Sequence, residues 1–436
     1  MAQDTQPDPL QFDTLQLHAG QEQPDPSGAR AVPIAATSSF CFESAEHARA
    51  VFAGEVAGNQ YGRMHNPTVA AFERRLAALE GGVAAVALSS GQAATTTALF
   101  ALARPGSNIV ASNQLFGGTF SVAKKLLEPW GCSFRAVEPT ADAIGDATGD
   151  DTVGVWLETI ANPSCAVPDI GAVAAVARAR GVPLIVDNTW GCGGYLCRPV
   201  ALGADIVIHS ATKWIGGHGT FIGGAIIDAG SFDWAAAAAR FPAFHQKDSR
   251  GRTYLSRAPH TPFTLRAFDL GLFTMGMTLS PHAAFAALQG LETLSLRVQR
   301  SCDSAFELAY WLEAQAGVRR VIYPGLPSHP SHEVAKRTLQ NGFGAVVSFE
   351  TDTAEAAATF LDRVQLASHL ANIGDAKTVV INPWTTTHAG MSEAARRAAG
   401  VTPELVRLSV GLEAIGDLKA DLSQALAPRC VPVSPT

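Results

Sequence analysis

The stretch "ADIVIHSATKWIGGHGT", residues 204–220, joins a run of apolar residues directly to Lys213. An apolar run that does not alternate with polar residues is typical of a strand buried on both faces of a sheet. A lysine beside such a strand is costly, because burial disfavours the charged ammonium form. The stretch therefore predicts a buried strand that ends at a reactive amine, with a snorkelling surface lysine as the alternative.

Similar apolar runs recur through the first half of the chain and indicate an α/β fold. They lie at 83–90, 108–112, 153–159, 183–188 and 223–228, and "NPTVAAFERRLAALEGG" (66–82) predicts a helix before the first of them. Continuous runs of this kind favour a mostly parallel sheet covered by helices. After about residue 275, longer helical sequence leads to the strand-like segments 344–350 and 405–413. This change predicts a smaller α+β domain.

We therefore expect three parts in the chain. Residues 1–65 are rich in Pro, Gly, Gln and Asp in their first sixty positions and form an extended N-terminal arm. Residues 66–275 form the large α/β domain, and residues 276–436 form a linking helix and the C-terminal domain. No internal repeat interrupts this division.

Composition narrows the class of protein. Charged residues make up 16% of the 436 residues, below the roughly 25% of ordinary soluble proteins, which favours extra surface buried between subunits. The net charge of -7, without a basic tract, argues against a nucleic-acid partner. The seven cysteines are an odd number and scattered, and we find neither a secretory signal nor an apolar segment of membrane-spanning length. We expect a cytoplasmic oligomer with reduced thiols.

Two of the predicted strands end in groups that suit a charged ligand. The run at 83–90 leads into "SSGQAATTTAL", where backbone N–H groups at Gly91 and Gln92 begin a helix that could hold an anion. A capped helix start without a ligand is the alternative, since the sequence lacks a nucleotide-binding glycine pattern. The run at 183–188 reaches Asp187, which either caps the next turn or anchors a cationic ring nitrogen.

A third strand end completes the set. The stretch quoted above supplies the hydroxyls of Ser210 and Thr212 and the amine of Lys213. The carboxyl ends of parallel strands meet at one edge of a sheet, where ligands gather. An anion site, a carboxylate and a lysine at one edge match the needs of pyridoxal 5'-phosphate, with the lysine forming a Schiff base. The sequence therefore predicts a pyridoxal phosphate enzyme.

Longer motifs carry a family resemblance. The chain resembles the Cys/Met-metabolism family of fold-type I pyridoxal-phosphate-dependent enzymes, and within it the O-acetylhomoserine sulfhydrylases. The similarity runs nearly end to end through "TLQLHAGQ", "GARAVPIAATSSF", "YGRMHNPT", "LEGGVAAVALSSGQAA", "VDNTW", "HSATKWIGGHGT", "LSPHAAFAALQGLETLSLR", "YPGLPSHP", "NIGDAKT" and "VRLSVGLE". The resemblance implies a transferase with a mostly parallel sheet, assembled as a homotetramer of two dimers.

The resemblance also implies roles for individual residues. Lys213 would bind the cofactor covalently and Asp187 would pair with its ring nitrogen. Asn162, in "ETIANPS", would bond near the ring hydroxyl and the substrate. The phosphate would be held by Gly91, Gln92, Ser210 and Thr212, together with Tyr61 and Arg63 of a neighbouring subunit.

Further residues bear on the substrate. The resemblance implies that Arg407 and Ser368 hold the substrate carboxylate. Phe116 stands where the family usually has tyrosine, so its ring would stack on the cofactor without a hydroxyl for proton transfer. Trp384 replaces a smaller residue and would narrow the substrate region.

These residues favour one reaction and leave others open. The resemblance implies γ-replacement on an O-acylated homoserine, with sulfide or a small thiol as the incoming group. A γ-lyase or γ-synthase acting on a methionine-like or canavanine-like amino acid is the alternative. A non-catalytic scaffold is disfavoured by the lysine, aspartate and arginine together, and a nicotinamide dehydrogenase by the missing dinucleotide loop. His218 and His388 lack partners at metal-ligand spacing, so we expect no metal.

Overall fold

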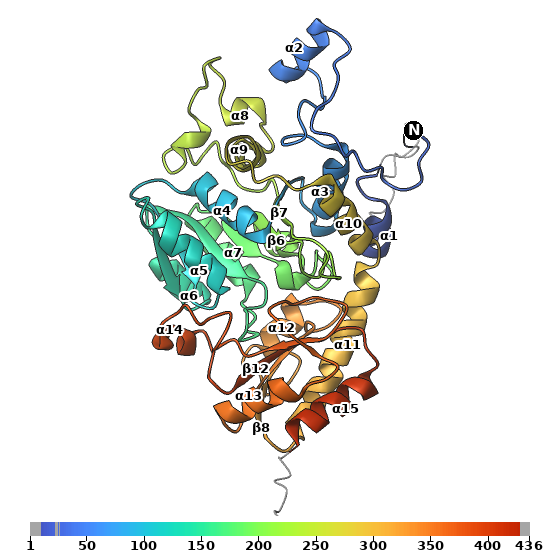
Figure 1. Cartoon of the computed structure of the whole chain (residues 1–436). Helices are drawn as coiled ribbons and strands as arrows, with labels where there is room; N and C mark the ends of the chain where they lie inside the picture. Colours follow the sequence, from blue (N-terminus) through green and yellow to red (C-terminus); the bar gives the residue numbers. More distant parts are fainter. Residues whose placement is uncertain (1–9, 22–24, 26, 428–436) are drawn as a thin grey trace, which may run out of the picture.

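The larger of two sheets has seven strands in the order β1-β7-β6-β5-β4-β2-β3. The computed structural model describes residues 10–21, 25 and 27–427 (Figure 1). Within the sheet, the strands from β6 to β3 are parallel, and β7 runs antiparallel to both of its neighbours. The strands are β1 (Ala84–Leu88), β2 (Asn108–Ser112), β3 (Ser133–Val137), β4 (Thr152–Glu158), β5 (Leu184–Asp187), β6 (Ile206–Ser210) and β7 (Gly224–Asp228).

The mostly parallel sheet predicted from the apolar runs is confirmed, and each run contains a strand. Strand β3 was missing from the prediction. It lies at the edge of the sheet and its sequence "SFRAV" is largely exposed, so it lacks the continuous apolar signal of the buried strands.

The second sheet has five strands in the order β10-β11-β12-β9-β8 and is antiparallel except for the first pair. Its strands are β8 (Val318–Ile322), β9 (Val346–Thr351), β10 (Ser368–His369), β11 (Val379–Ile381) and β12 (Leu405–Ser409). Figure 1 shows α10 (Pro281–Glu292) and α11 (Leu294–Glu313) leading from the large sheet to this one. The expected linking helix is thus two helices in succession.

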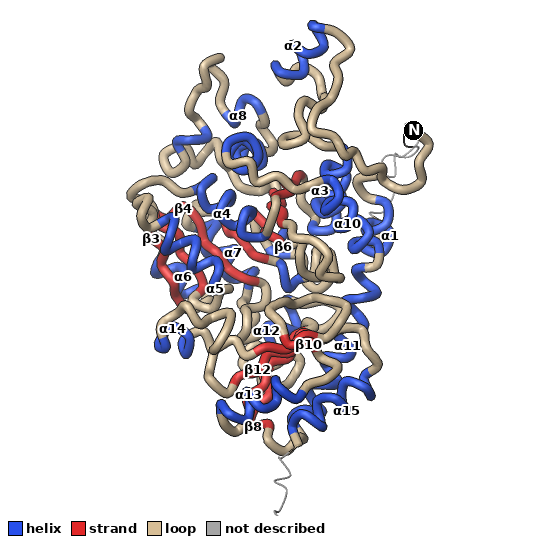
Figure 2. The backbone as a smooth tube through the Cα atoms, in the orientation of Figure 1, coloured by secondary structure: helices blue, strands red, loops and turns tan. Residues whose placement is uncertain are grey.

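Helices cover both sheets, as the tube in Figure 2 shows. Helix α3 begins where predicted, because the Asn66 side chain accepts hydrogen bonds from the N–H groups of Thr68 and Val69, and it ends at Gly81, which has φ +79°. Helix α3 spans Pro67–Glu80. The remaining α-helices are α1 (Phe12–His18), α2 (Ala45–Ala53), α4 (Gly91–Leu102), α5 (Gly117–Val122), α6 (Ala141–Ala147), α7 (Ile170–Ala179), α8 (Tyr254–Arg257), α9 (Pro262–Phe268), α12 (His332–Thr338), α13 (Ala354–Arg363), α14 (Glu393–Ala398) and α15 (Ile415–Leu426).

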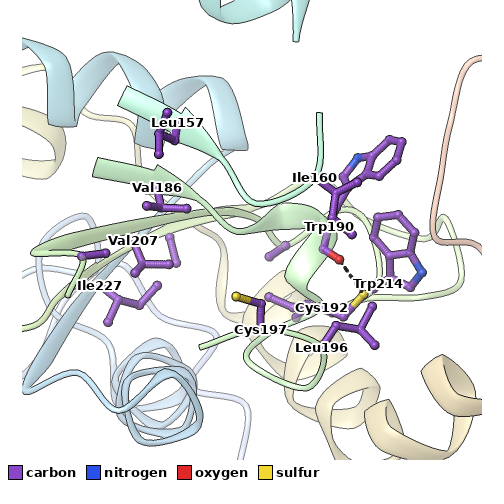
Figure 3. Packing of buried hydrophobic residues seen from close by; sticks show 14 of the residues in the cluster. Leu157, Ile160, Val186, Trp190, Cys192, Leu196, Cys197, Val207, Trp214 and Ile227 are labelled. Atoms are coloured by element: carbon purple, nitrogen blue, oxygen red, sulfur yellow. Dashed lines mark hydrogen bonds between the residues drawn. The ribbon is translucent and has the colours of Figure 1, made fainter. Parts of the chain in front are cut away.

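The large sheet is buried on both faces. On one face Leu157, Val186, Val207 and Ile227 come from four neighbouring strands and pack together (Figure 3). Beyond the strand ends this cluster continues into Trp190 and Trp214, whose rings meet edge to face with centroids 6.0 Å apart. Tight packing on both faces fixes the positions of the strand ends.

The segment expected as an extended arm is partly helical. Helix α1 packs against α3, and the buried Gln16 donates a hydrogen bond to Ser295 Oγ at 2.9 Å. Helix α2 stands away from the rest of the chain in Figure 1. Residues 1–9 of the arm and 428–436 of the C-terminal domain, with Cys430, lie outside the described residues. The other six cysteines are unpaired, and none of the described helices is long and apolar enough to cross a membrane.

Candidate active site

A cavity of about 400 Å³ opens at the carboxyl ends of the parallel strands and is closed on one side by residues of the second sheet. Its lining includes most of the site residues predicted from the sequence: Gly91, Gln92, Phe116, Asn162, Asp187, Ser210, Thr212, Lys213 and Arg407. Their meeting at one place follows from the parallel sheet, which gathers several strand ends at the same edge.

The start of α4, where the sequence predicts an anion site, lines the cavity. Ser90 caps the helix by accepting the N–H of Ala93 at 3.0 Å. A Cβ on Gly91 would lie 2.7 Å from Ser210 Cβ, so only glycine allows the helix start to approach the end of β6 this closely. Gly91, Gln92, Ser210 and Thr212 line the same cavity, and a helix start with hydroxyl residues beside it suits a phosphate. The Thr212 hydroxyl also donates to the carbonyl of Gly223 at 3.2 Å.

Two carboxyl groups, the buried Glu158 and the half-buried Asp187, lie next to each other in the cavity lining. Asp187 ends β5 and accepts the N–H of Thr189 at 3.0 Å, and Glu158 is its neighbour in register on β4. Burial raises the pKa of both groups, and the charge of Asp187 raises that of Glu158 further. A cationic ring nitrogen here would relieve the cost of the Asp187 carboxylate, so the pair fits a pyridinium.

Glu158 was not among the site residues predicted from the sequence. Its Oε1 accepts the backbone N–H of Phe116 at 2.5 Å, and its Oε2 accepts that of Asn162 at 3.3 Å. It therefore holds two loops that carry predicted site residues. A glutamate at the end of a buried strand is a signal that sequence reasoning could have used, since an unpaired carboxylate is rarely buried.

Lys213 lines the cavity. It follows β6 by three residues, in a turn where its N–H donates to the carbonyl of Ser210 at 3.2 Å. Its Nζ donates to Asn372 Oδ1 at 2.7 Å. Burial, with a smaller contribution from Arg407, lowers the pKa of Lys213 to about 8. The amine is thus easily deprotonated, as a nucleophile and base must be.

Arg407 lies opposite the strand ends, on β12 of the second sheet. Its side chain is 3% exposed, and its Nη1 donates to Asn162 Oδ1 at 2.9 Å while its Nη2 donates to the carbonyl of Asn372 at 3.1 Å. Its buried Nε has no hydrogen-bond partner among the described residues. Burial lowers the pKa of this guanidinium to about 10. A buried, incompletely paired arginine in a cavity suits a carboxylate ligand.

Ser368, predicted beside Arg407, lies outside the cavity lining. It belongs to β10, where its N–H donates to the carbonyl of Thr378 at 2.9 Å. Asn372 lines the cavity instead, four residues further along the same segment. The sequence pattern gave no signal that distinguishes the two positions, because the chain turns between them.

Tyr61 and Arg63 also lie outside the cavity lining of their own chain. The Tyr61 side chain is 44% exposed, and Arg63 donates to the carbonyls of Leu272 and Phe273. The Arg63 guanidinium lies 5.7 Å from the centroid of the Tyr61 ring. The two residues are therefore neighbours, Tyr61 exposed and Arg63 half-buried, and neither lines the cavity of its own chain.

Phe116 and Trp384, the two residues that depart from the family pattern, lie in different places relative to the cavity. Phe116 lines the cavity, as expected. Trp384 does not, because Asn382 Oδ1 accepts its N–H at 2.8 Å in a tight turn and its ring lies 3.8 Å from the guanidinium of Arg396. The expectation that Trp384 narrows the substrate region is thus not supported by its position.

The histidines show no sign of metal binding. His218 Nδ1 lies 2.8 Å from the carbonyl of Gly216, and burial lowers the pKa of His388 to about 4. Within residues 10–21, 25 and 27–427, no group of three His, Cys, Asp or Glu side chains could hold a metal ion.

Comparisons with known proteins identify the family of this chain. Residues 13–427 match the family model described as "Cys/Met metabolism PLP-dependent enzyme". The chain is 46% identical to a homocysteine/cysteine synthase of Saccharomyces cerevisiae, over 96% of this chain and 98% of the relative. It is also 46% identical to O-acetyl-L-homoserine sulfhydrylase 1 of Thermus thermophilus, over 96% of this chain and all of the relative.

A solved structure agrees as well. A putative O-acetylhomoserine (thiol)-lyase of Campylobacter jejuni, whose structure contains a pyridoxyl-lysine monophosphate, superposes with a TM-score of 0.91 and 33% identity. The match covers 96% of this chain and 100% of that one. These findings confirm the expected fold type and cofactor, and the chain belongs to the family of pyridoxal-phosphate-dependent enzymes of cysteine and methionine metabolism.

Proposed function

We propose that this enzyme replaces the γ-acetoxy group of O-acetyl-L-homoserine by sulfide, giving homocysteine and acetate. The observation that carries the proposal is the cavity that combines Lys213, Asp187 and Arg407. Relatives that share 46% of its residues over nearly the whole chain are named homocysteine synthase and O-acetyl-L-homoserine sulfhydrylase, which supports this substrate and nucleophile.

The residues divide the work of holding cofactor and substrate. Lys213 would bind the cofactor aldehyde, Asp187 its ring nitrogen, and the start of α4 with Ser210 and Thr212 its phosphate. Pyridoxal phosphate, when bound, supplies an aldehyde that joins to the substrate amino group and a cationic ring that accepts electrons from Cα. Arg407 would hold the substrate carboxylate and so fix the position of Cα in the cavity.

Lys213 performs the proton transfers in this proposal. When it does not hold the cofactor, its amine would take the proton from Cα, and a pKa of about 8 leaves much of the free amine unprotonated at mildly alkaline pH, whereas most of it is protonated at neutral pH. Loss of a Cβ proton lets the Cγ–O bond break with acetate as the leaving group. Sulfide then forms the new Cγ–S bond, and protons return to Cβ and Cα.

Phe116 is compatible with this leaving group. Acetate departs as a weak base, so its departure does not need a proton from the tyrosine hydroxyl that is missing at position 116. The ring remains in the cavity lining, where it can cover the cofactor, and Glu158 holds its backbone in place.

A paired assay tests the function. Purified enzyme loaded with pyridoxal phosphate is supplied with O-acetyl-L-homoserine, with and without sulfide, while homocysteine and 2-oxobutanoate are measured. We expect homocysteine as the main product when sulfide is present. Equal amounts of 2-oxobutanoate in both reactions, with little homocysteine, would contradict replacement and identify a γ-lyase.

We further propose that Tyr61 and Arg63 complete the phosphate site of a second copy of the chain in a homotetramer of two dimers. The exposure of Tyr61 and the position of both residues outside their own cavity support this arrangement. The six unpaired cysteines among the described residues support a reducing compartment, the cytoplasm.

Mixing two inactive variants tests the shared site. Arg63→Ala and Lys213→Ala each remove a different part of the same site, and we expect both to be nearly inactive alone. After unfolding and refolding together, half of the dimers are mixed and one of their two sites is intact, so about a quarter of the unmodified activity should return. Arg74→Ala mixed with Lys213→Ala is the control for refolding. If no activity returned in the Arg63 mixture while that control refolded normally, each site would have to be built from one chain.

A further inference from the structure

We propose that the side chain of Asn372 is a positioning residue, which holds the free amine of Lys213 in the place from which it reaches Cα. This inference rests on the proposed function, because it concerns the state in which the substrate has replaced the lysine on the cofactor. Asn372 was not among the residues predicted from the sequence, and it contacts the two groups most directly concerned with an amino acid substrate.

The contacts of Asn372 place it between the lysine and the carboxylate site. Its Oδ1 accepts a hydrogen bond from Lys213 Nζ at 2.7 Å. Its backbone carbonyl accepts one from Arg407 Nη2 at 3.1 Å. Because the side chain serves the lysine and the main chain serves the arginine, one residue sets the distance between the amine and the group that would hold the substrate.

The segment that carries Asn372 is itself held firmly. The N–H of Gly374 donates to Ser409 Oγ at 2.9 Å, which ties the segment to β12. The N–H of Ala376 donates to the carbonyl of Gly217 at 2.8 Å, which ties it to the loop after Lys213. Gly374 has φ +71°, and a Cβ there would lie 2.7 Å from the backbone nitrogen of Trp214. The amide therefore has a fixed position relative to both partners.

An amide is well suited to this role. Its oxygen accepts a hydrogen bond from the lysine whether the amine is neutral or protonated, so it can hold Nζ both before and after the proton leaves Cα. Unlike a carboxylate, it carries no charge and does not raise the pKa of the lysine. The other charged groups that line the cavity are Asp187, Glu158 and Arg407.

The test measures exchange of the Cα proton of L-2-aminobutyrate for deuterium, followed by NMR in D₂O with the loaded enzyme. This amino acid lacks a γ leaving group, so exchange reports proton transfer by the lysine alone. We expect Asn372→Ala to slow exchange by about 10- to 100-fold, a part of the usual contribution of a placed base. Its cofactor content and its affinity for aminobutyrate, measured by absorbance titration, should change less than about threefold, since alanine keeps the carbonyl that Arg407 contacts.

The variant Asn372→Asp provides a second measurement of the same role. It keeps the size and the acceptor oxygen but adds a negative charge beside Nζ, so the midpoint of the exchange rate against pH should move upward by about one unit or more. His369→Ala is the matched control, because His369 is exposed and lies three residues earlier in the same segment. We expect this control to exchange at the unmodified rate.

The outcomes separate the positioning role from a structural one. The proposal is overturned if Asn372→Ala exchanges within about twofold of the unmodified enzyme, or if the control slows as much. If Asn372→Ala fails to bind the cofactor, the test rests on Asn372→Asp. An unchanged midpoint of the exchange rate against pH in that variant would then be sufficient to overturn the proposal. Exchange of the Cα proton needs neither acetate departure nor sulfide. A failed homocysteine assay with normal exchange would therefore reject the proposed function only. Absence of exchange in the unmodified enzyme would reject both the proposed function and the role of Asn372.

Discussion

Replacing Lys213 by methionine is expected to lower the turnover of O-acetyl-L-homoserine by at least about 10³-fold. The change removes both the group that binds the cofactor covalently and the base for Cα, and such residues act as a unit whose loss is not additive. Methionine has nearly the length of lysine, so the cavity keeps its shape. The measurement is the rate of homocysteine formation, together with borohydride reduction and mass spectrometry, which should attach the cofactor to Lys213 in the unmodified enzyme only.

Lys125→Met is the control for this experiment, because Lys125 is an exposed lysine elsewhere in the large domain. It should keep both turnover and cofactor attachment. If Lys213→Met retained more than about a tenth of the activity, or if reduction fixed the cofactor to another lysine, the assignment of the catalytic amine would be wrong.

The same variant should stabilise the cofactor-free protein. In the folded chain the pKa of Lys213 is about 8, against 10.5 for an ordinary lysine, so between these pH values the folded state binds fewer protons than the unfolded state. Below pH 8 the folded protein therefore bears the full free-energy cost of burying the ammonium, and this cost disappears as pH rises toward 10.5. Methionine should raise the unfolding free energy by roughly 2–3 kcal/mol at neutral pH and by almost nothing near pH 10.5. Urea unfolding at several pH values measures the difference, and a gain that did not change with pH would argue against a desolvated ammonium.

Replacing Asp187 by asparagine is expected to lower turnover by about 10²- to 10⁴-fold, because it removes the charge that keeps the cofactor ring nitrogen protonated. Asparagine can still accept the N–H of Thr189, so the turn after β5 should survive. Cα–H exchange of L-2-aminobutyrate should fall with turnover, since the ring would accept electrons less readily. The absorbance of the bound cofactor should also change, while its phosphate contacts remain.

Asp169→Asn serves as the comparison for this charge removal. Asp169 caps α7 by accepting the N–H of Ala172 at 3.0 Å, and asparagine caps helices as well. This variant should keep the activity of the unmodified enzyme. Full activity in Asp187→Asn, with normal cofactor content, would mean that another group supports the ring nitrogen, and Glu158 is the neighbouring carboxyl in the register of the sheet.

Local sequence patterns predicted much of the fold and of the candidate site of this enzyme. Apolar runs that do not alternate are sufficient to identify strands buried on both faces, and a parallel sheet then requires that their carboxyl ends meet. For this reason Asp187 and Lys213 could be placed at one edge before the fold was known. The assignments of Arg63, Asn162 and Arg407 depended on the family resemblance, because nothing in their local pattern distinguishes them from ordinary surface or strand residues.

The sequence by itself determined the strand ends, the helix start at Gly91 and the lysine, because each depends on residues adjacent in the chain. Only the tertiary structure decided that Asn372 rather than Ser368 lines the cavity and contacts Arg407, and that Glu158 holds the backbone of Phe116. Only the fold placed the Trp384 ring against Arg396 and outside the cavity lining. Lys213 and Asn372 are 159 residues apart in the chain. Contacts over such separations are fixed by how the segments around the two sheets pack together, which periodicity and local spacing do not encode.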